Sequence, residues 1–377
     1  MSLENRIGIV GGGQLGRMMT LDAKRLGFEV IVVDSTPNSP AKQVGAEQIV
    51  APLTDEAATR QLAEVSDFLT FEIEHINTDV LRELRESGIR VNPSPETLET
   101  IKDKLNQKRF LQGWGIPVVE FSEVTDRDGA LEVASLFGFP FVLKSRFGGY
   151  DGRGNLVVMD GKELDWALEK FGKQPLYAER YVRLEKELAI MVARSMSGEI
   201  VTYPVVETIH RNNICHIVLA PAPVDIKVYQ QAENISREIM RHLKGAGVFG
   251  IEMFMTRDGE VLVNELAPRV HNSGHYTIEA CRTSQFEQHV RAITGLPLGS
   301  TEMTVPAAVM VNILGDRQGK AQVLGLNEVL KIRNAGVHIY GKAETKPERK
   351  MGHITVVADS IEEARRNAEL ARSLISI

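Results

Sequence analysis

Residues 7–19, which read IGIVGGGQLGRMM, constrain the fold most strongly because three consecutive glycines follow an apolar run. Apolar residues then recur at helical spacing, and residues 28–34 predict a second strand. A strand–helix–strand unit with short connections predicts a parallel sheet covered by helices. Gly11, Gly13 and Gly16 also have the spacing of a dinucleotide-binding turn, which leaves the ligand of this turn to be decided.

The predicted elements change character along the chain. Strands and helices alternate up to about residue 100, whereas most elements between 141 and 221 are strands separated by turns. The last helix begins at Ser360 with a capping box. A chain of 377 residues is too long for one core, so we predict three domains of mixed α/β (α+β) structure. Their expected bounds are 1–100 for a Rossmann-like domain, 101–297 for a central domain with a flap lobe at about 115–182, and 298–377 for a small β-rich domain.

Composition argues against several classes of function. The net charge is −6 and the pI is near 5.9, so no global positive field indicates a nucleic-acid partner. Cys215 and Cys281 are too few for a disulfide framework or a zinc knuckle, and we expect reduced thiols. Neither a signal peptide nor an apolar run of about 18 residues is present, so we expect a cytoplasmic protein without a membrane partner.

The strongest site signal is a predicted hairpin at 247–269. Asp258-Gly259 is a favoured two-residue turn, and such a turn places Glu252 directly opposite Glu265. The Cβ atoms of the two carboxylates would then lie about 4.5–5.5 Å apart. The predicted face of the sheet would also hold Phe254, Val261 and Val263.

Two carboxylates opposed on an apolar face are destabilising unless a cation lies between them. The alternatives are that one carboxyl is protonated or that the register differs. We favour the cation, and oxygen-only ligands indicate Mg²⁺ rather than zinc. Glu252 and Glu265 are therefore the predicted metal ligands, and Asn264 would add a further oxygen.

A second signal is FVLKSRFGGYDGRGN at 141–155. Lys144 lies in an apolar strand, and a glycine-rich loop and another strand follow it, which differs from the strand–loop–helix order of a Walker motif. A flexible glycine loop can close over phosphates while a lysine neutralises their oxygens. Alone, such a hairpin is more often a simple turn. Together with a two-carboxylate magnesium site, it predicts a site for a nucleoside triphosphate.

Several motifs occur in an order that is specific as a set: GGGQLGRM, TFEIEHI, KDKLNQK, GGYDGRG, AERYV and NELAPRVHNSGH. Over nearly the whole chain they resemble the ATP-grasp superfamily, and within it the N5-carboxyaminoimidazole ribonucleotide synthase family of purine biosynthesis. The resemblance implies a three-domain ATP-grasp fold with a Rossmann-like pre-ATP-grasp domain. It further implies an ADP-forming carbon–nitrogen ligase, a homodimer, that uses ATP, bicarbonate and about two Mg²⁺ ions to carboxylate 5-aminoimidazole ribonucleotide.

The resemblance also implies an ATP site. Lys104 and Lys144 would bind the phosphates, and residues 179–182 would form an adenine hinge because an exposed strand offers its backbone groups to the base. Glu187 would bind the ribose hydroxyls and His210 would lie near the nucleotide, although a surface charge and a loop histidine are the alternatives on the residues alone. The other implied ATP ligands are Gly149, Tyr150, Asp151, Gly152, Arg153, Gly154, Asn155, Glu179, Arg180, Tyr181, Val182, Asn264 and Glu265.

The implied chemistry requires groups that hold bicarbonate and the ribonucleotide. Bicarbonate would attack the γ-phosphate to give carboxyphosphate, and either this species or CO₂ released from it would meet the exocyclic amine. The candidate catalytic residues are Tyr150, Asp151, Arg153, Arg269 and His271. A basic C-terminal segment, GKAETKPERK at 341–350, which would otherwise predict a solvated loop, would bind the 5′-phosphate. The candidate substrate ligands are Gln14, Leu15, Glu72, Asn272, Lys342, Arg349 and Lys350.

Other functions compete with this interpretation. An NAD-dependent oxidoreductase would use the first glycine turn together with Asp34, but it explains neither the paired carboxylates nor the flap. Among ATP-grasp ligases, a formate-dependent glycinamide ribonucleotide transformylase would differ at EIEHIN and HNSGH, and the short C-terminal domain argues against a biotin carboxylase. An inactive ATP-grasp regulator is disfavoured because the lysines, the flap and both carboxylates are present. The glycine turn is then free to face the ribonucleotide.

Overall fold

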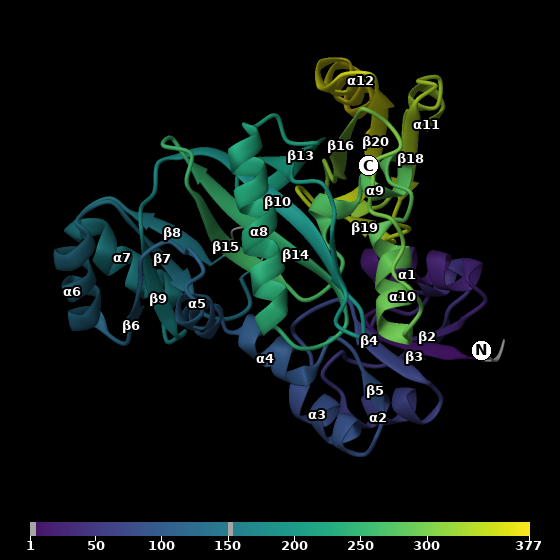
Figure 1. Ribbon diagram of the computed structural model, residues 1–377, viewed down its shortest axis with the longest axis horizontal. Helices are drawn as coiled ribbons and strands as arrows, with labels where there is room; N and C mark the ends of the chain where they lie inside the picture. The colour runs from purple at the N-terminus through teal and green to yellow at the C-terminus, as the bar shows by residue number, and fades with distance from the viewer. Residues whose placement is uncertain (1–4, 150–153) are drawn as a thin grey trace.

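The computed structural model describes residues 5–149 and 154–377. Four of the predicted site residues, Tyr150, Asp151, Gly152 and Arg153, lie outside the described residues. Figure 1 shows the first domain at the lower right, a flap lobe at the left and a large central sheet between them, with the C-terminal strands at the upper right.

The first domain is the predicted parallel sheet. Its five strands have the order β3-β2-β1-β4-β5 and are all parallel. The strands are β1 (Arg6–Val10), β2 (Glu29–Asp34), β3 (Glu47–Val50), β4 (Phe68–Phe71) and β5 (Arg90–Val91). The helices are α1 (Gln14–Arg25), α2 (Glu56–Glu64), α3 (Thr78–Glu86) and α4 (Pro95–Lys102), with a short 3₁₀ turn η1 (Lys42–Val44). The Ser94 hydroxyl accepts the Thr97 N–H and begins α4, as its sequence predicts.

The flap lobe has its own sheet and its own core. Its strand order is β6-β9-β7-β8, and all of its pairs are antiparallel. The elements are α5 (Lys104–Gly113), which leads into the lobe, then β6 (Phe121–Val124), α6 (Arg127–Phe137), β7 (Phe141–Ser145), β8 (Asn155–Val158), α7 (Gly161–Phe171) and β9 (Leu176–Arg180). Leucine, valine and phenylalanine side chains of α6 and α7 pack on this sheet and form a separate hydrophobic core.

The central sheet has nine strands and carries the candidate site. Its order is β15-β14-β10-β12-β13-β16-β20-β18, and β11 pairs with β10. The strands are β10 (Leu184–Arg194), β11 (Ile200–Thr202), β12 (Val206–Arg211), β13 (Ile214–Ala220), β14 (Gly247–Thr256), β15 (Val261–Ala267), β16 (Ala307–Leu314), β18 (Ala335–Ile339) and β20 (Lys350–Ala358). One face packs on α8 (Ile226–His242), and the other packs on α10 (Gln285–Thr294), which in turn packs on α1.

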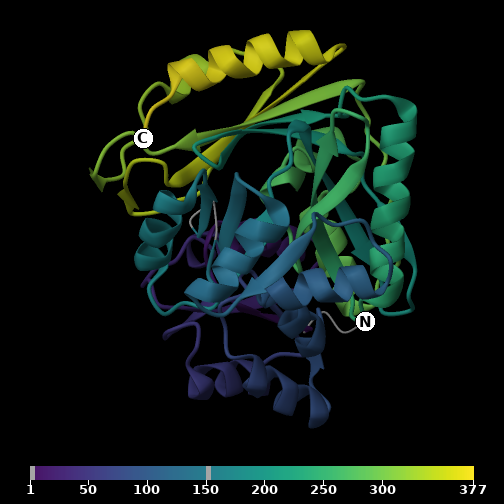
Figure 2. The ribbon, with the colours of Figure 1, turned by 90° about the vertical axis from the view of Figure 1, so that its left-hand side faces the viewer.

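The C-terminal segment extends the central sheet. β13 pairs antiparallel with β16, so β16, β18 and β20 continue the ladder that begins at β15. Its other elements are α11 (Leu326–Val329), α12 (Ile361–Leu374) and the short pair β17 (Gly319–Lys320) and β19 (Glu344–Thr345). Figure 2 shows α12 lying across the outer face of these strands. The segment that was expected to form a small domain therefore shares a sheet with the hairpin.

Two further expectations concern the whole chain. Both cysteines are thiols and not a disulfide, as predicted, and both are buried. Within residues 5–149 and 154–377, none of the helices has the length and apolar character needed to cross a membrane.

Candidate active site

The two hairpin carboxylates lie opposite each other, but the predicted turn is wrong. The Thr256 N–H donates to the carbonyl oxygen of the residue four positions later, at 2.9 Å, so the loop has three residues and not two. Gly259 ends this loop with a φ of 81°, as is common in such loops. The longer loop alone would pair Glu252 with Asn264. A β-bulge at Asn264 shifts the register by one residue and places Glu252 opposite Glu265.

The bulge also changes the apolar neighbours of the carboxylates. Val261 and Val263 pair with Met255 and Met253 and belong to the core beneath α8, on the opposite face from Glu252. The predicted place of Val261 and Val263 beside the carboxylates is therefore wrong. Of the three predicted apolar neighbours, Phe254 alone lies on the same face of the sheet as the carboxylates. The carboxylate side chains are 30% and 39% exposed, so their face is open to a ligand.

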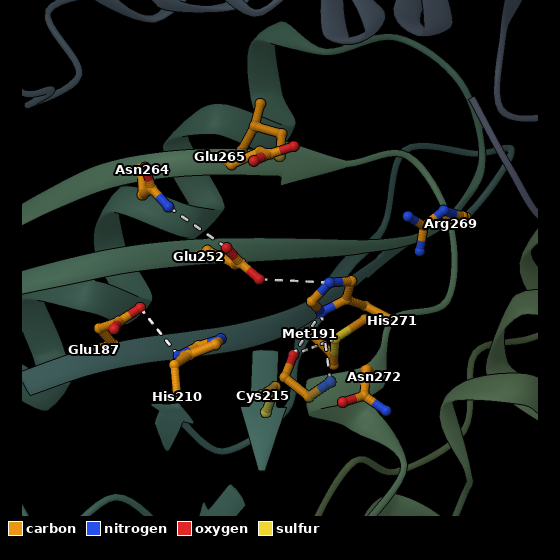
Figure 3. Close-up of polar contacts among 12 residues, drawn as sticks. Glu187, Met191, His210, Cys215, Glu252, Asn264, Glu265, Arg269, His271 and Asn272 are labelled. Atoms are coloured by element: carbon orange, nitrogen blue, oxygen red, sulfur yellow. Dashed lines mark hydrogen bonds and ion pairs between the residues drawn. The ribbon is translucent and has the colours of Figure 1, made fainter. Parts of the chain in front are cut away.

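The carboxylate pair has few contacts within the protein (Figure 3). Glu252 Oε1 lies 3.5 Å from His271 Nε2, and Asn264 donates to Glu252 Oε2 at 3.5 Å. Lys104 Nζ donates to Glu265 Oε2 at 3.0 Å. Burial and the nearby charge of Glu265 raise the pKa of Glu252. Only Glu265 has a close ammonium partner, so the charge of the pair is compensated in part, which favours a bound cation.

The donor set fits magnesium rather than a metal that needs a complete protein cage. The described residues contain no group of three or more histidine, cysteine, aspartate and glutamate side chains arranged to hold a metal ion. Mg²⁺ commonly takes one or two carboxylates and completes its octahedron with water and substrate phosphates. Glu252 and Glu265 would hold such an ion beside Asn264.

The flap begins as the sequence predicts. β7 and β8 pair antiparallel with Lys144 opposite Asn155, and the Ser145 N–H donates to the Gly154 carbonyl at 2.8 Å. Gly148 has a φ of 70°, which favours glycine, and Gly149 follows it. The strand–loop–strand arrangement is confirmed, and Lys144 lies at its base.

The predicted hinge differs from expectation. Its first residues were expected in an exposed strand, but β9 lies between β6 and β7. Glu179 pairs with both strands, and Arg180 pairs with β7. The Glu179 side chain is buried, 2.6 Å from Lys144 Nζ. Arg180 forms an ion pair with Glu120 at 2.7 Å. The strand ends at Arg180, so of the four predicted hinge residues only Tyr181 and Val182 lie beyond the sheet ladder.

Glu187 and His210 come together on neighbouring strands. Glu187 lies on β10, His210 lies on β12, and His210 Nδ1 is 3.1 Å from the Glu187 carboxylate. Burial opposes protonation of His210, but its contact with Glu187 outweighs burial and raises its pKa. The alternative of a loop histidine is wrong. Figure 3 shows the pair on the same side of the sheet as Glu252.

The loop after the hairpin turns toward the first domain. Arg269 lies 3.0 Å from Glu74, which follows β4. Burial and then the charge of Arg269 lower the pKa of His271 well below its ordinary value, so its imidazole is neutral near pH 7. The predicted role of His271 in holding bicarbonate would therefore not rest on a positive charge, and it stays a prediction. Asn272 exchanges two hydrogen bonds with the buried amide of Asn312, at 3.0 and 2.6 Å.

The glycine turn of the first domain holds an acidic side chain. Glu72 accepts hydrogen bonds from the backbone N–H groups of Gly13 and Gly16. Asp34 accepts the N–H groups of Gly12 and Thr36, at 2.9 and 2.8 Å. A pyrophosphate needs these same donors. Because two carboxylates occupy them, the turn is unsuited to NAD despite its spacing.

The residues around this turn come from both ends of the chain. Gln14 and Leu15 open α1, and the Leu15 side chain is buried in the core. The positive charge of Lys342 acts on Glu72, and that of Lys350 acts on His271. Lys342 Nζ donates to the Lys350 carbonyl oxygen at 2.7 Å.

The basic segment makes hydrogen bonds both within itself and to the first domain. Arg349 donates to the Glu344 carbonyl oxygen at 2.7 Å. The Gln43 side chain of the first domain donates to the Gly341 carbonyl oxygen at 2.8 Å. The basic segment is therefore held against η1 of the first domain.

Two charged residues near the site were missed at the sequence level. Lys108 lies on α5 four residues after Lys104, a spacing that places both side chains on one helix face. Glu74 lies two residues after Glu72, and the same EIEH motif contains both. The helical spacing could have identified Lys108, whereas no sequence signal indicates that Glu74 pairs with Arg269.

Three segments of the chain match known families. Residues 4–102 match the ribonucleotide synthetase preATP-grasp domain, and residues 109–286 match the ATP-grasp domain. Residues 308–367 match the phosphoribosylaminoimidazole carboxylase C-terminal domain. With the mixed α/β fold described above, these matches define the class: the chain is an ATP-grasp enzyme, an ADP-forming ligase.

Solved structures and sequence relatives narrow this class. N5-carboxyaminoimidazole ribonucleotide synthetase from Thermotoga maritima is 49% identical, with a TM-score of 0.90 and 99% of each chain covered. The Aspergillus clavatus synthase, solved with ADP and 5-aminoimidazole ribonucleotide, is 39% identical, with a TM-score of 0.92 and 99% of each chain covered. Phosphoribosylaminoimidazole carboxylase of Schizosaccharomyces pombe is 46% identical over 98% of this chain, which spans 68% of that protein. The chain belongs to the N5-carboxyaminoimidazole ribonucleotide synthase family.

Proposed function

We propose that this chain carboxylates the exocyclic amine of 5-aminoimidazole ribonucleotide, with ATP and bicarbonate as co-substrates, in purine biosynthesis. The observation that carries the proposal is the undercompensated carboxylate pair Glu252/Glu265, which lies close to Lys104 and Lys144 at the base of a glycine flap. A separate turn, occupied by Glu72 and close to Lys342, supplies a second site for the ribonucleotide.

The reaction proceeds in two steps. A bicarbonate oxygen attacks the γ-phosphorus of ATP, which forms carboxyphosphate and releases ADP. The amine then attacks the carboxyl carbon of carboxyphosphate, or CO₂ released from it, and gives the carbamate and phosphate. Within residues 5–149 and 154–377, Arg269 is a cation suited to hold bicarbonate, because it follows β15 and already binds a carboxylate, that of Glu74. Flap closure would exclude water, which hydrolyses carboxyphosphate.

Mg²⁺ is part of this proposal. When bound by Glu252 and Glu265, it would neutralise charge on the phosphate oxygens during transfer. Lys104 and Lys144 would share that task from the flap side. We also propose, from the family resemblance, that the protein is a homodimer in the cytoplasm. Light scattering of the purified protein would test the dimer.

The remaining substrate roles are proposed on position. Each oxygen of Glu72 accepts one backbone N–H and retains a second lone pair, which can accept a ribose hydroxyl. Lys342, Arg349 and Lys350 would hold the 5′-phosphate. Asn272 and the backbone of Gln14 and Leu15 would line the same pocket.

Substrate-dependent ADP release tests the function directly. We expect release with 5-aminoimidazole ribonucleotide and bicarbonate together and only background release with either one alone. Release with glycinamide ribonucleotide and formate would instead support the transformylase alternative. Tight binding of NADH in the absence of Mg·ATP binding would contradict the whole assignment.

A further inference from the structure

Lys108 is a buried lysine that the proposed reaction does not yet use. It projects from α5 into the space between the flap lobe and the central sheet, and its side chain is 1% exposed. Its Nζ lies 2.9 Å from Glu179 Oε1 on β9 and donates to the Val263 carbonyl oxygen on β15 at 3.1 Å. A lysine is almost never fully buried unless it is paired. The contacts of Lys108 therefore require an explanation.

Glu179 is shared by two lysines. Its other oxygen, Oε2, lies 2.6 Å from Lys144 Nζ, and Lys144 also contacts Asn264 Oδ1 at 3.4 Å. Burial opposes ionisation of Glu179, but the charges of Lys108 and Lys144 outweigh burial and lower its pKa to about 2. The carboxylate is thus ionised and holds a cation on each side.

The two lysines differ in what they can reach. Lys144 lies at the base of the flap and beside Asn264 of the β14–β15 hairpin, called the metal hairpin because it carries Glu252 and Glu265. A nucleotide phosphate would be bound there. Lys108 is enclosed by protein and is directed at a backbone carbonyl. If Lys144 turned toward a phosphate, a Glu179 without Lys108 would remain as a buried, uncompensated charge. Such a charge is strongly unfavourable.

We propose that Lys108 is a positioning residue for nucleotide binding: it is the fixed counter-ion of Glu179, and it thereby allows Lys144 to exchange this carboxylate for phosphate oxygens. The inference rests on the proposed ATP site, and it adds a residue that acts on ATP only through Glu179 and Lys144. It assigns the two lysines different tasks. Lys108 stays paired with Glu179, whereas the ammonium group of Lys144 moves from Glu179 to the phosphate oxygens of the ligand.

A double-mutant cycle in the full-length protein tests this inference. The variants are K108M, E179Q and K108M/E179Q, with Mg·ATP affinity measured by titration calorimetry and unfolding followed in parallel. We expect K108M to bind Mg·ATP about tenfold more weakly or worse, because Lys144 must then remain with Glu179. In the E179Q background the same lysine change should alter affinity by less than about threefold, because no carboxylate remains to be compensated.

A matched control is K102M, the same substitution six residues earlier, where the lysine donates to the Thr78 hydroxyl at 2.7 Å. It should leave Mg·ATP affinity unchanged. Wild-type affinity in K108M would overturn the inference, as would an equal loss of affinity in both backgrounds. If K108M does not fold, the comparison of K108M/E179Q with E179Q still decides, since an additional tenfold loss there contradicts the inference. Absence of Mg·ATP binding by the wild-type protein would instead overturn the proposed function.

Discussion

Two acidic sites of this molecule differ in how far neighbouring groups compensate their negative charge. In the first domain, Glu72 faces a glycine turn and accepts two backbone N–H groups. In the central sheet, Glu252 and Glu265 face each other, and the contacts of Glu252 to Asn264 and His271 are 3.5 Å long. Backbone N–H groups hold the carboxylate of Glu72, whereas nearby side chains compensate the repulsion between Glu252 and Glu265 only in part.

The difference indicates which ligand each site accepts. A carboxylate held by backbone donors has a fixed position and offers its remaining lone pairs to hydroxyl groups. Two opposed carboxylates that share a single lysine partner, Lys104, favour a divalent cation and the phosphates that accompany it. The same residue type therefore indicates a ribose in one site and a metal–nucleotide complex in the other.

Removal of a carboxylate from the pair should have the largest effect. We expect E265Q to lower kcat for substrate-dependent ADP release by about 10³-fold, because a metal ligand that stabilises transferring phosphate is lost. The half-saturating Mg²⁺ concentration should rise as well. E260Q is the matched control, since Glu260 is exposed in the same hairpin and contacts neither carboxylate. A near-normal kcat for E265Q would break the comparison.

Removal of the carboxylate from the glycine turn should act on a different substrate. We expect E72Q to raise KM for the ribonucleotide by about tenfold to a hundredfold and to leave KM for Mg·ATP nearly unchanged. An amide also places a donor against the N–H groups of Gly13 and Gly16, so stability should fall by about 2 kcal/mol in denaturant titration. E86Q, an exposed change on α3, serves as the control. Equal effects on both substrates would show that the two sites are not separate.

A buried histidine joins the two strands that lead to these sites, and it should make stability depend on pH. His289 Nε2 lies 2.8 Å from the Thr70 hydroxyl on β4, and its Nδ1 accepts the Val248 N–H on β14 at 3.1 Å. Burial lowers the pKa of His289 to about 3. The unfolded chain therefore binds a proton at higher pH than the folded chain, and stability falls as the pH falls below the ordinary histidine pKa.

This effect is the smallest of the three. Between about pH 7 and pH 5.5, His289 should cost the wild-type protein about 1 kcal/mol more than the same change of pH costs H289Q. Denaturant midpoints of the two proteins at both pH values give this difference. Parallel pH dependence in the two proteins would contradict the burial of a neutral imidazole at this contact.

Sequence patterns predict the structure correctly where short-range interactions determine it. Alternation of strands and helices predicts the parallel sheet of the first domain, and Ser94 and Ser360 mark true helix starts. Glu252 and Glu265 were paired correctly although the turn was wrong, because the three-residue loop and the bulge at Asn264 compensate for each other. A bulge has no sequence signal as clear as that of a two-residue turn.

The failures concern contacts between segments distant in sequence. Glu179 was expected in an exposed strand, but pairing of β9 with both β6 and β7 buries it. The charge of His271 depends on burial by surrounding elements, which periodicity does not report. Pairing of β13 with β16, about 90 residues apart, likewise has no local signal. Tertiary pairing, rather than propensity, decides each of these features.

The shared ladder has a consequence for shortening this protein. β13 is paired on both sides, with β12 and β16, and most of its side chains are buried. A chain that ended before Ala307 would keep the metal hairpin but expose β13 as an unpaired apolar edge. The unpaired N–H and C=O groups of such an edge can pair with a strand of another molecule. The truncated protein should therefore self-associate, so residues 307–377 protect solubility as well as carrying the basic segment.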